Sequence, residues 1–286
     1  MIAASFDYSA PETLADALRV LSDDPEAKIL AGGQSLIPIM KLRLSIPSQV
    51  VDLGGIIDLH AIAEEEGIIR IGSMTTHEQV EHSELLSEKC PLLVAAASGI
   101  GDVQVRNRGT IGGSVAHADP AADYPAALQA LDAKVKVVSS AGEKIIPIDE
   151  FIVDALTTAL EPDEIITEIH VPTESTGIGT AYETIVQPAS GYAIVGVAAR
   201  IGLSEGNISF ARVGITGVGS KAYRALAVEK ALEGQPAKDD TYGIASRVAA
   251  EGVEALEDLH ASSEYRAHLA TVFTCRAIAA AAGRAQ

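Results

Sequence analysis

Two glycine-rich segments of the sequence could build a binding site for an anion. The first spans Ala31–Ser35 and the second spans Arg108–Ser114, and each contains an adjacent pair of glycines. Glycine lets backbone N–H groups approach a bound anion closely, because it has no Cβ atom. Successive N–H groups in a tight turn form a concave anion site. Each segment could be a simple turn, but together they could hold a diphosphate between two parts of the fold.

Neither segment matches the usual nucleotide-binding motifs. The sequence contains no G-x-x-x-x-G-K-S/T motif and no G-x-G-x-x-G motif directly after a strand. The run Gly214–Gly219 has its glycines in a different order and follows an expected hairpin strand, so we interpret it as a loop. Spacing alone therefore leaves the nature of the ligand open.

The other residues that could bind a metal or take part in catalysis do not form a recognisable pattern. His117 and Asp119 could bind a metal or exchange a proton, but a metal site needs three or four converging ligands. We therefore expect them to be polar loop residues near a ligand. Cys90 and Cys275 are too few for an iron–sulfur cluster, which normally needs four thiolates. The sequence thus predicts no catalytic residue and no metal site. We expect these further histidines to be scattered and exposed: His60, His77, His82 and His170.

The composition favours a folded protein in a reducing compartment. The 286 residues are enough for two or three domains, and 48% of them are hydrophobic. The formal charge of −18 disfavours nucleic acid and anionic membranes as partners. The longest apolar run, Pro91–Ile100, is much shorter than the roughly 20 residues that span a bilayer. Since the first residues do not resemble a signal peptide, we expect a cytoplasmic protein without an integral membrane segment.

Local patterns predict a small α/β unit around the first glycine segment. Ser9, Pro11 and Glu12 form a capping-box pattern, which predicts that the first helix starts there. The first glycine segment would lie between a strand and a helix, whose N-terminus adds positive potential. The predicted elements after the first helix are a strand at Lys28–Ala31, a helix at Leu36–Arg43 and a strand at Gln49–Leu53.

The second glycine segment lies in a longer region of mixed elements. Its glycine content predicts that residues 106–117 are not regular helix. Thr76 and Gln79 form a second capping-box pattern, and Asp123 with Pro125 predicts the start of a helix that ends near residue 132. The other predicted elements are strands at 68–71 and 165–171, a buried helix at 91–100, and a hairpin of 134–139 with 144–148.

After about residue 176 the pattern changes to strands followed by helices, which indicates a separate C-terminal domain. A turn at Ser204–Asn207 makes the strands on either side of it antiparallel. The predicted strands span 180–186, 193–203 and 207–215, and the predicted helices span about 224–233, 239–256 and 263–282.

Both glycine segments resemble the FAD loops of one known family. Ala31–Pro38, followed by Lys41–Arg43, resembles the first FAD loop of the medium subunit of carbon monoxide dehydrogenase and its relatives. Gln104–Ser114 resembles the second FAD loop, and this long motif is the more specific. The family includes bacterial xanthine, quinoline, nicotine and aldehyde hydroxylases. Because the resemblance covers nearly the whole chain, the chain is identified as a member of these FAD-binding subunits of molybdenum hydroxylases.

The resemblance implies an α+β, PCMH-type fold similar to that of vanillyl-alcohol oxidase, in which two subdomains enclose non-covalently bound FAD. Subdomain 1 would span residues 1–56 and subdomain 2 residues 57–175, and an α+β domain with a three-stranded antiparallel sheet would span residues 176–286. Asp123 would accept hydrogen bonds from the adenosine ribose or cap its helix, and Tyr192 would cover part of the flavin ring or pack in the core. The residues implied to bind FAD are Ala31, Gly32, Gly33, Gln34, Ser35, Leu36, Thr110, Ile111, Gly112, Gly113, Ser114, Asp123, Leu160 and Tyr192.

The chain departs from the family pattern at three points. In the carbon monoxide enzyme a basic residue follows the first strand of the C-terminal domain, whereas this chain has Ile185–Pro188 without Lys or Arg. Gln34 stands where the carbon monoxide enzyme has histidine. The four-cysteine insertion of the benzoyl-coenzyme A reductase branch is also missing from the sequence. The sequence therefore assigns neither a carbon monoxide substrate nor an iron–sulfur cluster to this chain.

The resemblance implies an electron relay that works only within a complex. A large partner subunit would hydroxylate substrate at a molybdenum cofactor, and a small partner subunit with two 2Fe-2S clusters would pass on single electrons. FAD in this chain would deliver them to an external acceptor, in an assembly that we expect to be a dimer of heterotrimers. Two alternatives stay open: a self-sufficient flavoprotein oxidase of the same fold, and a non-enzymatic protein that binds a phosphate-containing ligand.

Overall fold

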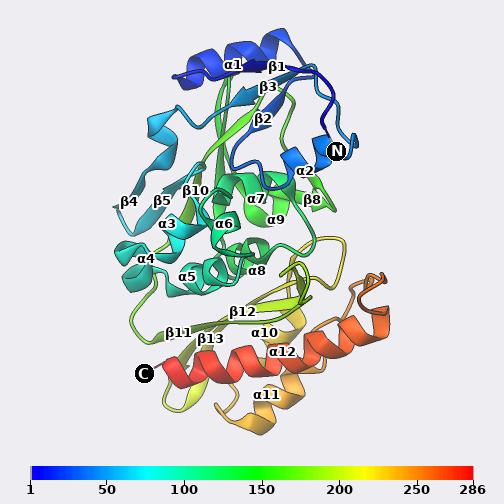
Figure 1. The fold of residues 1–286 in the computed structure, drawn as a ribbon. Helices are drawn as coiled ribbons and strands as arrows, with labels where there is room; N and C mark the ends of the chain where they lie inside the picture. Colours follow the sequence, from blue (N-terminus) through cyan, green and yellow to red (C-terminus); the bar gives the residue numbers. More distant parts are fainter. Residues whose placement is uncertain (1, 286) are drawn as a thin grey trace.

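Three main β-sheets follow one another along the chain, with helices packed between and around them (Figure 1). The computed structural model describes residues 2–285. The N-terminal sheet lies at one end of the molecule and the C-terminal sheet near the other, with the five-stranded sheet between them (Figure 1). No helix within residues 2–285 has the length and apolar character needed to cross a membrane.

The N-terminal unit is a three-stranded parallel sheet, as the predicted α/β unit requires. The predicted cap at Ser9 is wrong, because Ser9 pairs with Val51 of the neighbouring strand. The first helix is capped instead by Thr13, whose hydroxyl accepts a hydrogen bond from Asp16 N at 3.1 Å. The elements are β1 (Asp7–Ser9), α1 (Leu14–Asp23), β2 (Lys28–Leu30), α2 (Leu36–Lys41) and β3 (Gln49–Asp52).

The middle unit is a five-stranded antiparallel sheet of order β4-β5-β10-β6-β7. The predicted hairpin is confirmed as β6 paired with β7, and the predicted capping box at Thr76 and Gln79 is confirmed at the start of α3. Its strands are β4 (Ile62–Glu65), β5 (Ile68–Gly72), β6 (Lys134–Ser139), β7 (Gly142–Pro147) and β10 (Ile165–Pro172). Its helices are η1 (Ile57–His60), α3 (His77–Glu81), α4 (Glu84–Lys89), α5 (Pro91–Ser98), α6 (Val103–Arg106), α7 (Ile111–His117), α8 (Asp123–Ala130) and α9 (Ile148–Phe151), and a small hairpin joins β8 (Ile152–Asp154) to β9 (Thr157–Thr158).

The prediction that residues 106–117 contain no regular helix is wrong, because α7 runs through the glycine pair. Thr110 caps this helix, and its hydroxyl accepts a hydrogen bond from Gly113 N at 3.1 Å. A Cβ atom on Gly112 would lie 2.5 Å from the Cβ atom of Ser73. Close packing against the middle sheet therefore requires glycine here, and it outweighs the low helix propensity of this residue.

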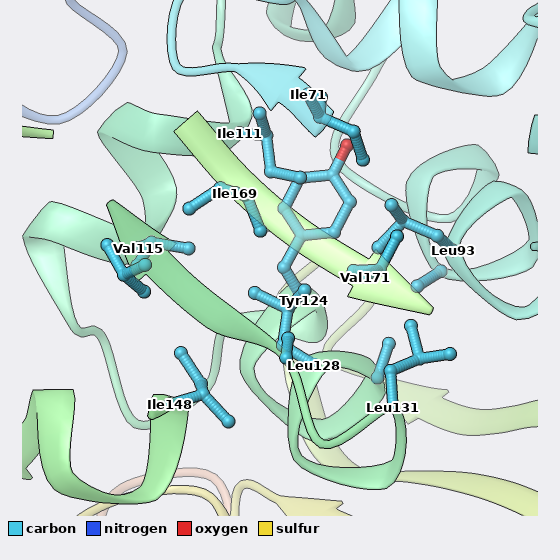
Figure 2. Packing of buried hydrophobic residues seen from close by; sticks show 14 of the residues in the cluster. Ile71, Leu93, Ile111, Val115, Tyr124, Leu128, Leu131, Ile148, Ile169 and Val171 are labelled. Carbon is cyan, nitrogen blue, oxygen red and sulfur yellow. The ribbon is translucent and has the colours of Figure 1, made fainter. Parts of the chain in front are cut away.

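The largest hydrophobic core lies between the middle sheet and its helices. Tyr124 of α8 is fully buried there among Ile71, Ile111 and Val171 (Figure 2). Every residue of α8 is buried, because α5 packs on one side and the C-terminal strands pack on another. Such a helix, buried on all sides, forms a shared wall between two units.

The C-terminal unit has an antiparallel sheet of four strands, not the predicted three, because the two-residue strand β14 extends it. Gly214 lies within β13, in agreement with the strand predicted over 207–215 and not with a loop over Gly214–Gly219, and the absence of a Cβ there lets the backbone of Ala126 in α8 approach. The helix predicted over 239–256 ends at Ser246, since the chain turns back and Leu256 N bonds to Val218 O at 2.8 Å. The elements are β11 (Ile178–Val186), β12 (Ala193–Ser204), β13 (Asn207–Thr216), β14 (Tyr223–Arg224), α10 (Leu226–Leu232), α11 (Asp239–Ser246) and α12 (Ser263–Arg284).

Candidate functional site

A cavity of about 730 Å³ opens where the N-terminal and middle units meet. This volume is in the range of roughly 300–1,000 Å³ that is typical of small-molecule pockets. Both glycine segments line the cavity, and Tyr192 reaches it from the loop between β11 and β12. Among the candidate residues only Ile111 does not line it, because its side chain is buried in the core.

The two glycine segments touch each other directly. A Cβ atom on Gly32 would overlap the carbonyl oxygen of Arg108, and a Cβ atom on Gly113 would lie 3.4 Å from that of Ala31. Small residues are therefore needed for the segments to close against one another. The structure thus brings together two loops that are far apart in the sequence, as the hypothesis of a shared site requires.

The first loop has the properties of an anion site. Gly33 adopts the left-handed conformation with φ of 74°, and the backbone N–H groups of Gly33, Gln34 and Ser35 have no acceptor among residues 2–285. Helix α2 follows at once, and the Ser35 side chain makes no capping hydrogen bond. Successive unpaired N–H groups that line a cavity favour a bound oxyanion, to which they can donate.

The second loop differs, because its backbone donors are already in use. Ile111 N bonds to Thr75 O at 3.0 Å and Gly112 N bonds to Ser73 O at 2.9 Å, while Gly113 N bonds to the Thr110 hydroxyl. This loop therefore offers the hydroxyl groups of Thr110 and Ser114 to a ligand, and it uses its backbone to fix its own position on the middle sheet.

Asp123 and Tyr192 approach the cavity from opposite units. The cap of α8 is Ala122, so the alternative that Asp123 caps the helix is wrong. Asp123 is only 6% exposed and accepts a hydrogen bond from the Tyr182 hydroxyl at 2.7 Å. Burial raises the pKa of this carboxyl to about 6, although the bond from Tyr182 lowers it. Tyr192 is 45% exposed, so the alternative that it packs in the core is also wrong. Leu160 packs against the middle core at the edge of the cavity.

Two polar residues of the cavity wall were missed by sequence reasoning. Ser73 and His77 line the cavity, and neither Ser73 Oγ nor His77 Nδ1 has a hydrogen-bond partner among the described residues. The expectation that His77 is exposed is wrong, and its burial, helped by the charge of Arg106, lowers its pKa to about 4. A bridge between Thr76 and Thr110 holds this segment beneath the second loop, a contact that no local pattern reveals.

His117 and Asp119 both line the cavity, but only Asp119 lies in a loop as expected, because His117 is the last residue of α7. One oxygen of Asp119 accepts a hydrogen bond from Ala121 N at 2.8 Å, so it stabilises the loop before α8. Within residues 2–285, no group of three or more His, Cys, Asp or Glu is arranged to hold a metal ion. The cavity therefore combines the hydrogen-bond donors of the two loops with a lining that is mostly apolar.

Comparison with known proteins decides the family. Residues 4–174 match the family described as the FAD binding domain in molybdopterin dehydrogenase, and residues 180–281 match the CO dehydrogenase flavoprotein C-terminal domain. The chain belongs to this flavoprotein family. The flavoprotein family predicted from the two glycine segments is therefore confirmed.

Relatives of this flavoprotein match it over nearly its whole length. It is 38% identical to the 6-hydroxypseudooxynicotine dehydrogenase complex subunit alpha of Paenarthrobacter nicotinovorans, over 99% of this chain and 96% of the relative. It is 37% identical to the carbon monoxide dehydrogenase medium chain of Afipia carboxidovorans, over 100% of both. A solved chain of carbon monoxide dehydrogenase from Hydrogenophaga pseudoflava matches it with a TM-score of 0.97 and 37% identity, again over 100% of both chains. The predicted α+β flavoprotein fold is thus confirmed.

Proposed function

We propose that the chain is the medium subunit of a molybdenum hydroxylase, and that it binds FAD in the cavity between the two glycine loops. The observation that carries this proposal is the first loop, where Gly33, Gln34 and Ser35 line a cavity that the second loop also lines, and their N–H groups have no acceptor among the described residues. These groups would hold the diphosphate from one side, and the hydroxyls of Thr110 and Ser114 would hold it from the other.

The remaining cavity residues suit the other parts of the cofactor. Asp123 would accept hydrogen bonds from the ribose hydroxyls, Tyr192 would cover part of the flavin ring, and Leu160 would provide an apolar contact. FAD, when bound, supplies the capacity to exchange both single electrons and electron pairs. The chain binds and orients the cofactor, and none of its own residues needs to act as a general base.

The relay requires partners. A small subunit with 2Fe-2S clusters would deliver electrons, a large subunit would hold the molybdenum cofactor, and the whole would be a cytoplasmic dimer of heterotrimers. The relatives named as a complex subunit and as a medium chain support this proposal. The proposal also includes the domain bounds: FAD-binding subdomain 1 at residues 1–56, subdomain 2 at 57–175 and the C-terminal domain at 176–286. Masses, molybdenum and iron measured on the natively purified assembly test it, and a homogeneous chain free of partners would contradict it.

A pair of glycine variants tests the cofactor site. Gly33 and Gly206 both have positive φ, of 74° and 78°, so alanine is strained at either position. Only Gly33 lines the cavity, and only there does a Cβ meet a neighbour, the Ile37 side chain at 2.7 Å. We expect Gly33→Ala to weaken FAD binding by about tenfold or more, through at least one misplaced donor. Gly206→Ala should bind FAD like the parent chain, measured by flavin titration.

The same titration, together with an oxidase assay of the isolated chain, separates the alternatives. A flavin-bound chain without turnover of its own supports the relay, whereas oxidase activity of the isolated chain supports a self-sufficient oxidase. A chain that binds no FAD at any concentration would overturn the proposal and favour a different phosphate-containing ligand. If Gly33→Ala retained full affinity, the first loop would not be the diphosphate site.

A further inference from the structure

The buried carboxylate of the cavity is held by a residue from a different unit. Asp123 is the first residue of α8, whereas Tyr182 belongs to β11 of the C-terminal sheet. The Tyr182 ring packs against the middle core, and its hydroxyl donates to Asp123 Oδ1 at 2.7 Å. Gly196 on the neighbouring strand leaves the space for this hydroxyl, which a Cβ there would overlap. The position of the Tyr182 oxygen is therefore fixed by packing.

We propose that Tyr182 is a positioning residue that keeps Asp123 ionised and turned toward the cavity, so that its other oxygen accepts ribose hydroxyl groups. This inference rests on the proposed FAD site. It makes the C-terminal sheet a part of the nucleotide site, although Tyr182 itself does not line the cavity. A hydrogen bond to a charged acceptor is stronger than one between neutral groups, which is why a single phenol can have this effect.

Among the side chains around Asp123, Tyr182 is the one that stabilises its ionised form. Burial favours the neutral acid and raises its pKa to about 6, and the Tyr182 hydroxyl is the side chain that opposes it. Asp123 forms no salt bridge with any residue that the structure describes. Other titratable or charged groups surround α8. Tyr192 and Asp119 lie near its start, and His77 and Glu81 of α3 lie near Tyr124, with the His77 and Tyr124 rings 5.3 Å apart. Arg200, Arg212 and Arg224 bond to Ala130 O or Asp132 near its end.

The pH dependence of FAD binding by the full chain tests the inference, with Tyr182→Phe as the variant. In the parent chain the affinity should fall as the pH drops through about 6, since a protonated Asp123 is a poorer acceptor. Without the phenol hydroxyl the pKa of Asp123 rises, so the loss of FAD affinity should begin at a pH about one unit higher. The Kd of the variant should then exceed that of the parent about fivefold near pH 6 and approach it near about pH 8.5.

A neighbouring tyrosine provides the matched control. Tyr124 is buried next to Asp123, but its hydroxyl has no partner among residues 2–285, so Tyr124→Phe should leave the pH profile unchanged. Asp123→Asn should weaken binding and remove the step near pH 6, and adding Tyr182→Phe to it should bring no step back. If Tyr182→Phe does not fold, Asp123→Asn alone still tests whether Asp123 is the group that titrates near pH 6.

The outcomes separate this inference from the proposed function. A parent chain that binds no FAD would overturn both. A parent chain that binds FAD, with Tyr182→Phe showing the parent profile, would overturn only the role of Tyr182. A step near pH 6 that survives in Asp123→Asn would show that another group titrates, and it would overturn the inference as well.

Discussion

At the scale of single residues, the cavity wall contains backbone N–H donors and buried polar side-chain atoms that have no hydrogen-bond partner among residues 2–285. Gly33, Gln34 and Ser35 line the cavity, and their backbone N–H groups have no acceptor in the part of the chain that the structure describes. Ser73 and His77 lie deeper, and burial without a hydrogen bond is unfavourable for a polar group. A charged group would be more unfavourable still, and this is the physical reason that His77 stays neutral.

The buried histidine makes the fold sensitive to acid. The pKa of His77 is lowered from 6.5 to about 4, so between these values the unfolded chain binds a proton that the folded chain does not. The free energy of unfolding should therefore fall as the pH drops from 6.5 to 4, with a contribution of about 3 kcal/mol from this residue. In His77→Gln this part of the decrease in the free energy of unfolding should be missing, as measured by urea unfolding at several pH values.

The exposed His82 provides the control for this prediction. His82→Gln should keep the full pH dependence of the parent chain, because the ring already meets water in the folded state. Asp123 also titrates in this range, but it does so in parent and variants alike, so the difference between them isolates His77. An identical pH dependence in His77→Gln and the parent would contradict the prediction.

At the scale of helices and strands, the sequence predicted best those elements whose determinants are local. The capping box at Thr76, the hairpin of β6 and β7, and the long helix α12 follow from residues within a few positions of one another. The failures depend on distant partners. Ser9 joins a parallel strand pair with Val51, and α7 forms because Gly112 packs on Ser73. A local pattern contains no information about such contacts.

The cap of α7 should stabilise the second glycine loop and, through it, the cofactor site. Thr110→Ala removes the acceptor of Gly113 N and one ligand hydroxyl, and it should cost about 1 kcal/mol of stability and weaken FAD binding. Ser83→Ala removes a similar cap on α4, where the hydroxyl accepts from Leu86 N at 3.3 Å, away from the cavity. It should cost similar stability without a change in FAD affinity. Equal losses of affinity in both variants would contradict a specific role of Thr110.

At the scale of the whole molecule, the sequence indicated three units but not how they share α8. The apolar character of this helix indicates burial, but periodicity cannot say what covers each side. The structure shows the middle core on one side and strands β12 and β13 on the other. The glycine motifs likewise indicated which residues would line the cavity. Sequence patterns did not predict the roles of Tyr182 and His77, because these roles arise only when the C-terminal sheet and the start of α3 reach the site.

One buried ion pair joins the middle unit to the C-terminal sheet. Arg200 of β12 makes two 2.8 Å hydrogen bonds to the carboxylate of Glu174 and a third, at 3.0 Å, to Ala130 O at the end of α8. Both charged side chains are only 7% exposed. Removal of one partner leaves the other charge buried and uncompensated, so Glu174→Gln should lower the free energy of unfolding by about 3–5 kcal/mol in urea titrations.

Two comparisons isolate the cause of that loss. Replacing both partners, with Glu174→Leu and Arg200→Met, should cost less than Glu174→Gln alone, because no unpaired charge remains in the interior. The exposed pair of Arg70 and Glu65, at 2.7 Å, is a control in which Glu65→Gln should cost no more than about 1 kcal/mol. If Glu174→Gln cost as little as Glu65→Gln, the ion pair would not hold the two units together. The apolar contacts of α8 and the remaining hydrogen bonds between the units, such as that of Tyr182 with Asp123, would then hold them together.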